Sequence, residues 1–148
     1  MEIEHITDLG SALGNVLNSS RGTRITIDKT DWLFDIDLDE VDRMYATLDK
    51  MFRGLLGECI VELGPPLYTD EDDRDRVDAW YPEALRLASW RRGDWNLYLA
   101  LAHQDKEAPI FIELGERKSC VDVERRDKIH FVGQSKDSPE KTTIRGIE

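Results

Sequence analysis

The most regular pattern of apolar and polar positions predicts one long amphipathic helix at about residues 38–56. Apolar side chains recur there every three or four residues, which is the spacing of one helical face. They are Val41, Met44, Tyr45, Leu48, Met51, Phe52, Leu55 and Leu56. Asp37 and Glu40 have the spacing of a capping box, and Gly57 is suited to end the helix. A similar repeat over residues 2–17, interrupted by two glycines, predicts a shorter N-terminal helix.

In the second half of the chain, large apolar residues recur at every second position, as they do in strands. Trp95 and three leucines occupy every second position over residues 95–101, and the alternation resumes over residues 110–114 after a polar turn. We therefore expect an antiparallel hairpin at about residues 95–114. Residues 85–91 are a further strand candidate, although the residues before them are equally suited to begin a helix.

Shorter segments complete the expected fold. Strand formers predict short strands at residues 24–28, 32–36, 59–63, 120–123 and 129–132. The first two of these are expected to pair as a hairpin through the turn between them. Gly64 and the two prolines after it should break regular structure, which predicts an exposed loop over residues 65–78.

Together these elements predict an α+β fold, with one or two helices packed on a mainly antiparallel sheet and the long helix covering one face. The chain of 148 residues has the length of one ordinary domain. We expect that domain to occupy residues 1–133 and to be followed by a polar C-terminal tail at residues 134–148.

The chain is strongly acidic, with a formal net charge of -11 at pH 7 and a pI of about 4.7. Such a surface repels phosphate groups, so neither nucleic acid nor an anionic membrane is an expected partner. It suits a basic protein instead. The sequence shows neither a signal peptide nor a membrane span. Its two cysteines, Cys59 and Cys120, form no metal or redox motif, so the expected location is the cytoplasm.

The acidic run at residues 70–78 is the first candidate site. It contains six acidic residues and only two basic ones, and Trp80 and Tyr81 follow it directly. An aromatic anchor with a charged rim is typical of a protein-binding site. We expect the contacts to be Asp72, Asp73, Asp75, Trp80 and Tyr81. The function that this predicts is non-catalytic binding of a basic protein, which the domain would neutralise or chaperone as an immunity protein or a secretion chaperone does.

The alternative is a small enzyme or ligand-binding domain. Its pocket would lie on the sheet face around Trp90, Trp95, His103 and Asp105, where a histidine beside a carboxylate could act as a general base. A third alternative is a homodimer formed through an open sheet edge.

Sequence motifs predict neither a cofactor nor a metal. Asp35, Asp37 and Asp39 have the spacing that begins a calcium loop, but Glu40 and Ala46 occupy the positions of its glycine and its last glutamate. The sequence contains no phosphate-binding glycine loop, nucleophile elbow or dinucleotide fingerprint, so no catalytic residue is assigned.

Overall fold

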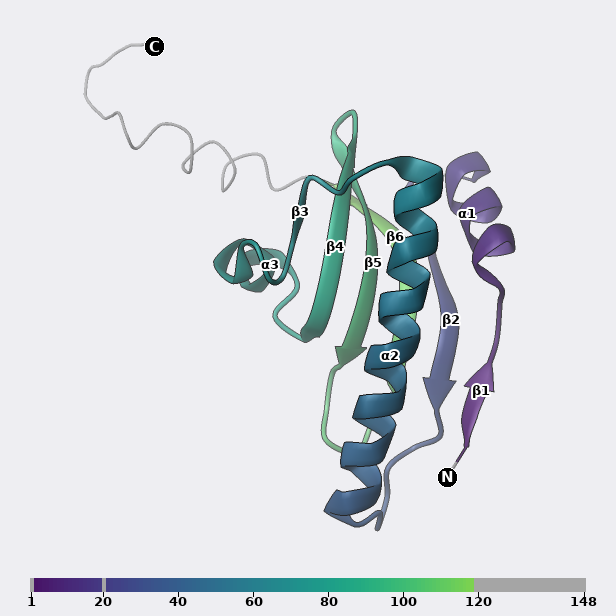
Figure 1. The fold of residues 1–148 in the computed structure, drawn as a ribbon, viewed down its shortest axis with the longest axis vertical. Helices are drawn as coiled ribbons and strands as arrows, with labels where there is room; N and C mark the ends of the chain where they lie inside the picture. Colours follow the sequence, from purple (N-terminus) through teal and green to yellow (C-terminus); the bar gives the residue numbers. More distant parts are fainter. Residues whose placement is uncertain (1, 20, 119–148) are drawn as a thin grey trace, which may run out of the picture. The chain divides into compact units, whose positions relative to one another are not determined.

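The computed structural model describes residues 2–19 and 21–118, and this part of the chain forms three helices on one antiparallel sheet of six strands (Figure 1). The helices are α1 (Leu9–Asn18), α2 (Leu38–Leu63) and α3 (Arg74–Trp80). The strands are β1 (Ile3–His5), β2 (Arg24–Thr30), β3 (Tyr68–Thr69), β4 (Ala84–Arg92), β5 (Trp95–His103) and β6 (Ile110–Lys118). They are ordered β1-β2-β6-β5-β4-β3 across the sheet, with every neighbouring pair antiparallel. The α+β prediction is confirmed.

Helices cover both faces of the sheet, and the strands supply a core to each. Leu97, Leu99 and Leu101 of β5 pack in the larger core, under α1 and α2. The alternate positions Tyr98 and Ala100 face the smaller core on the other side, where α3 contributes Val77. The two cores are consistent with the period-two geometry of a strand, which turns successive side chains to opposite faces. The long helix therefore covers one sheet face, as the sequence predicts (Figure 1).

Helix α2 continues past its predicted end. Its 26 residues run through Gly57 to Leu63, so the predicted end at residue 56 and the predicted strand at residues 59–63 are both wrong. Gly57 is exposed within the helix, whereas Cys59 is fully buried and extends the apolar stripe. Burial of that stripe outweighs the weak helix propensity of one glycine. The helix ends instead at Gly64, whose φ of 85° suits a residue without a side chain.

The N-terminal predictions need two further corrections. The first residues form β1 on the edge of the sheet, and α1 begins only at Leu9, where the Asp8 side chain accepts a hydrogen bond from the Ser11 amide at 2.8 Å. The predicted hairpin of residues 24–28 with 32–36 does not form. Strand β2 pairs with β1 and β6 instead, and residues 32–36 contain no strand. A strand inside the sheet satisfies both of its backbone edges, which a two-stranded hairpin cannot do.

The remaining predictions are confirmed in part. The hairpin at residues 95–114 is confirmed as β5 and β6, and residues 85–91 are in β4. The prediction of an exposed loop at residues 65–78 is wrong, because this segment contains β3 and most of α3, and Tyr68, Asp70 and Val77 within it are buried against the sheet. The predicted strands at 120–123 and 129–132, and the boundary of the domain at residue 133, lie outside the described residues. Within residues 2–19 and 21–118, no helix has the length and apolar character needed to cross a bilayer.

Candidate functional site

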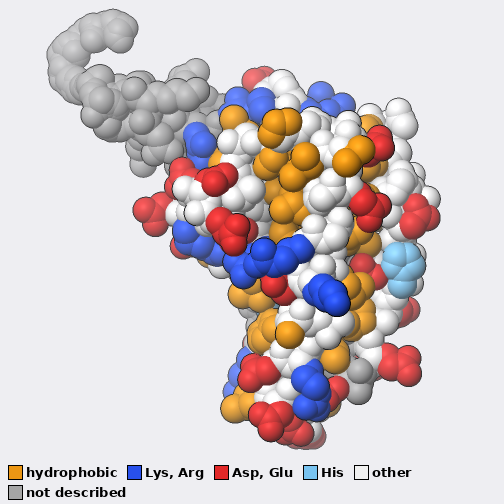
Figure 2. Space-filling view, viewed as in Figure 1, with side chains coloured by type: hydrophobic (Ala, Val, Ile, Leu, Met, Phe, Trp, Pro, Cys, Tyr) orange, Lys and Arg blue, Asp and Glu red, His pale blue; other side chains and the backbone are white. Residues whose placement is uncertain are grey.

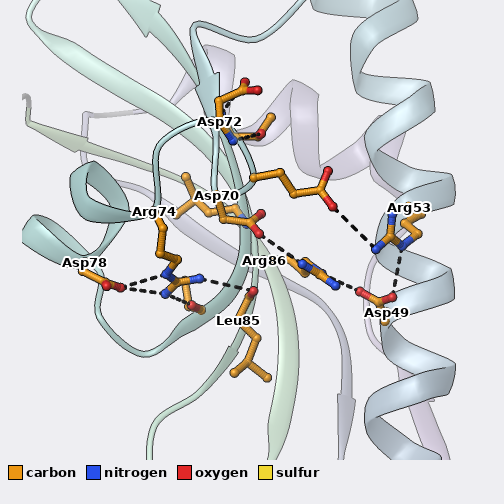
Figure 3. Close-up of polar contacts among 12 residues, drawn as sticks. Asp49, Arg53, Asp70, Asp72, Arg74, Asp78, Leu85 and Arg86 are labelled. Atoms are coloured by element: carbon orange, nitrogen blue, oxygen red, sulfur yellow. Dashed lines mark hydrogen bonds and ion pairs between the residues drawn. The ribbon is translucent and has the colours of Figure 1, made fainter.

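The acidic run at residues 70–78 is held mainly by contacts within its own part of the fold (Figure 3). Asp70 is buried, and its carboxylate accepts hydrogen bonds from the Leu87 amide at 2.8 Å and from Arg86 Nη1 at 3.2 Å. The Asp73 side chain caps α3 by accepting from the Arg76 amide at 3.2 Å. These two carboxylates satisfy backbone amides that would otherwise lack a partner, so their first role is structural.

The other acidic side chains of the run differ in how far they are engaged. Asp72 and Thr69 exchange two hydrogen bonds between side chain and backbone, each 3.2 Å long. Asp78 accepts from Arg74 Nη2 at 2.8 Å. Asp75 is exposed. Of the predicted contacts in the run, it is the one whose carboxylate has no hydrogen bond or ion pair with a described residue. Local pairing of this kind lowers the net charge that the run presents to a partner.

The two aromatic residues of the predicted anchor are directed toward the protein. Trp80 is partly buried and donates its indole N–H to the Tyr68 hydroxyl at 2.7 Å. Tyr81 is only 3% exposed and donates its hydroxyl to Glu113 at 2.7 Å. A side chain this deeply buried does not contact a partner while the fold is intact. The predicted set of five contacts is therefore not assembled as one exposed surface.

Glu113 is the centre of a buried polar network on the α3 side of the sheet. Its carboxylate accepts hydrogen bonds from the hydroxyls of Tyr81 and Tyr98, each at 2.7 Å, and from Arg24 Nη2 at 3.1 Å. Burial, together with the Glu113 charge, raises the pKa of both tyrosines, which remain neutral donors. Both carboxylate oxygens have partners, so the network is complete without a ligand.

The alternative pocket is not formed, because its residues lie at opposite ends of β5. Trp95 begins this strand and His103 ends it. Eight residues of strand span about 26 Å. Trp90 lies near the Trp95 end and donates its indole N–H to the Gly64 carbonyl at 2.8 Å, whereas Asp105 lies in the turn after His103. No single pocket contains all four side chains.

His103 nevertheless contacts a residue that the sequence did not single out as a site residue. Its Nδ1 is hydrogen-bonded to the Tyr45 hydroxyl of α2, and its Nε2 lies 3.1 Å from the Ala108 carbonyl oxygen. The carbonyl only accepts, so Nε2 carries the proton, and in the neutral ring Nδ1 accepts from Tyr45. Both nitrogens of His103 are thus engaged. Among the residues described, no group of three histidine, cysteine or carboxylate side chains is placed to hold a metal.

The most exposed aromatic residues of the described chain lie elsewhere, between β2 and α2. Trp32 and Phe34 are 55% and 56% exposed, and their rings stack with centroids 5.7 Å apart. Leu33 between them is buried, and its amide donates to the Glu107 carbonyl at 2.8 Å. This contact anchors the extended segment and leaves its flanking side chains in solvent. Leu38, which is 78% exposed, completes what we call the aromatic tip (Trp32, Phe34 and Leu38).

Unpaired acidic side chains surround the aromatic tip. Residues 31–42, which we call the acidic segment, contain six acidic residues and no lysine or arginine. Within the part of the chain that the structure describes, the carboxylates of Asp35, Asp39 and Asp42 accept no hydrogen bond and form no ion pair. Figure 2 shows acidic and hydrophobic side chains at the lower end of the molecule, where α2 begins, with basic side chains beside them. This surface combines an apolar centre with a charged rim.

A groove of about 610 Å³ begins beside the acidic segment and follows α2 toward β4. We call it the α2–β4 groove. It is lined by Asp42, Tyr45, Ala46, Asp49, Leu85, Arg86 and Leu101. Asp49 and Arg86 close part of it through a hydrogen bond of 2.9 Å between Oδ1 and Nε (Figure 3). Burial raises the pKa of the Tyr45 hydroxyl, and the Asp42 charge raises it further.

The local sequence favours another structure for this surface. Aromatic residues favour strands, so Trp32 and Phe34 predict a strand, and the acids beside them have the spacing of a helix cap. Asp37 does cap α2, accepting from the Glu40 amide at 2.9 Å. The sequence feature that distinguishes this surface is the absence of any basic residue from the acidic segment.

Comparisons of the chain with protein-family models, with curated proteins and with solved structures found no match. The function of the aromatic tip and of the α2–β4 groove is therefore inferred from their own residues.

Proposed function

We propose that this protein is a non-catalytic binding domain that captures a basic protein through the aromatic tip and the acidic segment around it. Its role would be to neutralise or chaperone that partner, as an immunity protein or a secretion chaperone does. The observation that carries the proposal is the stacked and exposed pair of Trp32 and Phe34 within a segment of six acidic and no basic residues.

The aromatic pair supplies enough apolar surface to anchor a partner. An aromatic side chain buries about 150–250 Å² when it is fully covered. Because Trp32 and Phe34 are 55% and 56% exposed, a partner can still cover a little more than half of each ring. About 100 Å² per ring corresponds to about 2.5 kcal/mol at 25 cal/mol per Å². That magnitude is typical of a binding hot spot.

The acidic segment supplies the preference for a basic partner. Asp35, Asp39 and Asp42 have no internal cation to neutralise them in the described chain, so their field acts on an approaching molecule. Exposed charges of this kind accelerate association and reject acidic surfaces more than they add to affinity. We therefore expect binding whose association rate falls as salt rises.

The acidic run at residues 70–78 has a secondary place in this proposal. Asp72 and Asp73 contribute mainly to local structure, whereas Asp75 is exposed and Trp80 is partly exposed. These two are compatible with the periphery of an interface.

The test is affinity capture from the lysate of the protein's own cells, with bound proteins identified by mass spectrometry. The wild-type chain is compared with the double variant Trp32→Ala/Phe34→Ala. We expect the wild type to retain a basic protein stoichiometrically and to release it at high salt. The double variant should bind that protein more than about 100-fold more weakly, because each tenfold loss corresponds to 1.4 kcal/mol.

A matched control separates this surface from general hydrophobicity. Val61 and Leu67 are 82% and 50% exposed and lie near the other end of α2. The double variant Val61→Ala/Leu67→Ala removes exposed apolar surface without touching the aromatic tip, so it should capture the partner as the wild type does. Equal capture by the wild type and by Trp32→Ala/Phe34→Ala would show that the proposed surface is wrong.

A further inference from the structure

We propose that the α2–β4 groove is a binding site for a lysine or arginine side chain of the partner. This inference deepens the proposed function and rests on it. Asp42, which lines the groove, is four residues after Leu38 of the aromatic tip in α2. Residues at this spacing are neighbours on one helix face, so the groove begins beside the tip. A partner that covers the tip can thus extend a long side chain into the groove.

The floor of the groove suits the alkyl stem of such a side chain. Ala46, Leu85 and Leu101 line it, and Leu85 is 41% exposed although it lies in β4 within the fold. Lysine and arginine pack their methylene groups along apolar surface while the charged end stays at a polar rim. The groove of about 610 Å³ is large enough for one such side chain and accompanying water.

The charges of the groove favour a cation. Of the two carboxylates in its lining, Asp49 is already paired with Arg53 at 3.0 Å and with Arg86 at 2.9 Å, so Asp42 is the one that attracts a ligand. Arg86 is held by Asp49 at 2.9 Å and by Asp70 at 3.2 Å, so its charge is already neutralised within the protein. Asp42 has no partner in the described chain and remains available to an incoming ammonium or guanidinium group.

The position of Tyr45 supports the same ligand. Its hydroxyl is committed to His103 Nδ1, so the phenol is a fixed wall of the groove. Asp42 lines the groove beside this wall, so its carboxylate acts on the same space that a ligand would enter. A cation entering beside Asp42 meets that negative charge at close range, whereas an anion would be repelled by it.

The test uses a probe that does not depend on the natural partner. Nα-acetyl-lysine methylamide is titrated into the isotope-labelled full chain and followed by backbone amide NMR. Nα-acetyl-norleucine methylamide has a matching aliphatic chain without the charge and is titrated as the control ligand. We expect millimolar binding of the lysine probe, with shifts centred on Asp42, Ala46 and Leu85, and weaker shifts with norleucine.

Two variants make the result specific to the groove. Asp42→Asn should weaken binding of the lysine probe about threefold, the effect of one exposed charge pair. Asp39→Asn removes a carboxylate that is also exposed and unpaired, one turn earlier on α2 and outside the groove, and should leave binding unchanged. The inference is overturned if the lysine probe shifts no groove amide, if norleucine binds equally well, or if Asp42→Asn binds like the wild type.

These outcomes are distinguishable from those of the capture experiment. The probe lacks the surface needed to cover the aromatic tip, so Trp32→Ala/Phe34→Ala should bind it like the wild type. Loss of partner capture by this double variant, with probe binding retained, supports both proposals. If the double variant still captures the partner and still binds the lysine probe, the proposed function is contradicted and the groove remains a cation-binding site.

Discussion

Gly115 of β6 is the position where a single methyl group should disturb the fold most informatively. It lies directly opposite Tyr98 in the β5–β6 register. A Cβ at this position would lie 2.8 Å from the Tyr98 hydroxyl oxygen and 2.9 Å from Cζ. The Tyr98 side chain is fully buried and cannot swing into solvent. Gly115→Ala should therefore push the ring aside and break its 2.7 Å hydrogen bond to Glu113.

The expected change in the free energy of unfolding is the sum of two destabilising effects and one stabilising effect. Loss of a hydrogen bond to a charged acceptor costs about 1.5–3 kcal/mol. Overpacking of a buried ring costs about 1–3 kcal/mol. Reduced freedom of the unfolded chain offsets about 0.4–1 kcal/mol of this. We expect Gly115→Ala to lower the free energy of unfolding by about 3 kcal/mol, measured by urea denaturation.

A double-mutant cycle tests the cause rather than the loss alone. Tyr98→Phe removes the hydroxyl that the new methyl group would strike, and by itself should cost about 1–3 kcal/mol. The variant Gly115→Ala/Tyr98→Phe should then be more stable than the sum of the two single effects predicts, by at least about 1 kcal/mol. Additive effects within about 0.5 kcal/mol would refute the proposed contact. Gly54→Ala, whose new methyl group meets no atom within 4 Å, is the control and should not destabilise α2.

Three further predictions concern other parts of the fold. Asp37→Ala removes the cap of α2 and should lower the free energy of unfolding by about 1 kcal/mol in urea. Burial opposes ionisation of Asp49, but hydrogen bonds from Arg86 and Arg53 outweigh it and lower the pKa. The stabilisation by Asp49 is therefore complete above about pH 4 and is lost as pH falls through the folded-state pKa. The free energy of unfolding of Asp49→Asn, measured below pH 4, should fall less steeply with decreasing pH than that of the wild type. Burial raises the pKa of the Cys59 thiol to about 12, so the reactive thiolate does not form at neutral pH. In the variant Cys120→Ser, a thiol reagent should therefore label the chain only after unfolding. Rapid labelling of the folded chain at neutral pH would contradict the burial of Cys59.

The sequence predicted those elements whose local pattern and tertiary environment agree. The stripe of α2 has a helical period, its cap at Asp37 is a contact between near neighbours, and the strands of the β5–β6 hairpin alternate over most of their length. Each signal lies within a short window of chain, so no distant contact is needed to interpret it. The α+β class follows from these elements alone.

The failed predictions depended on distant partners. Residues 3–5 continue a helical repeat, yet they are a strand because β2 lies beside them with an unpaired edge. Cys59 favours neither element strongly, and it is helical because its side chain completes the core beneath α2. In both cases, contacts between residues far apart in sequence outweighed local preference.

The same distinction between local pattern and distant contacts applies to the candidate site. The sequence by itself determined that the chain is acidic, that its acids are clustered and that tryptophans lie beside them. Only the tertiary structure decided which acids are already paired and which rings are exposed. It buried Tyr81 against Glu113 and left Trp32 in solvent, because burial and pairing depend on what the fold brings against each side chain.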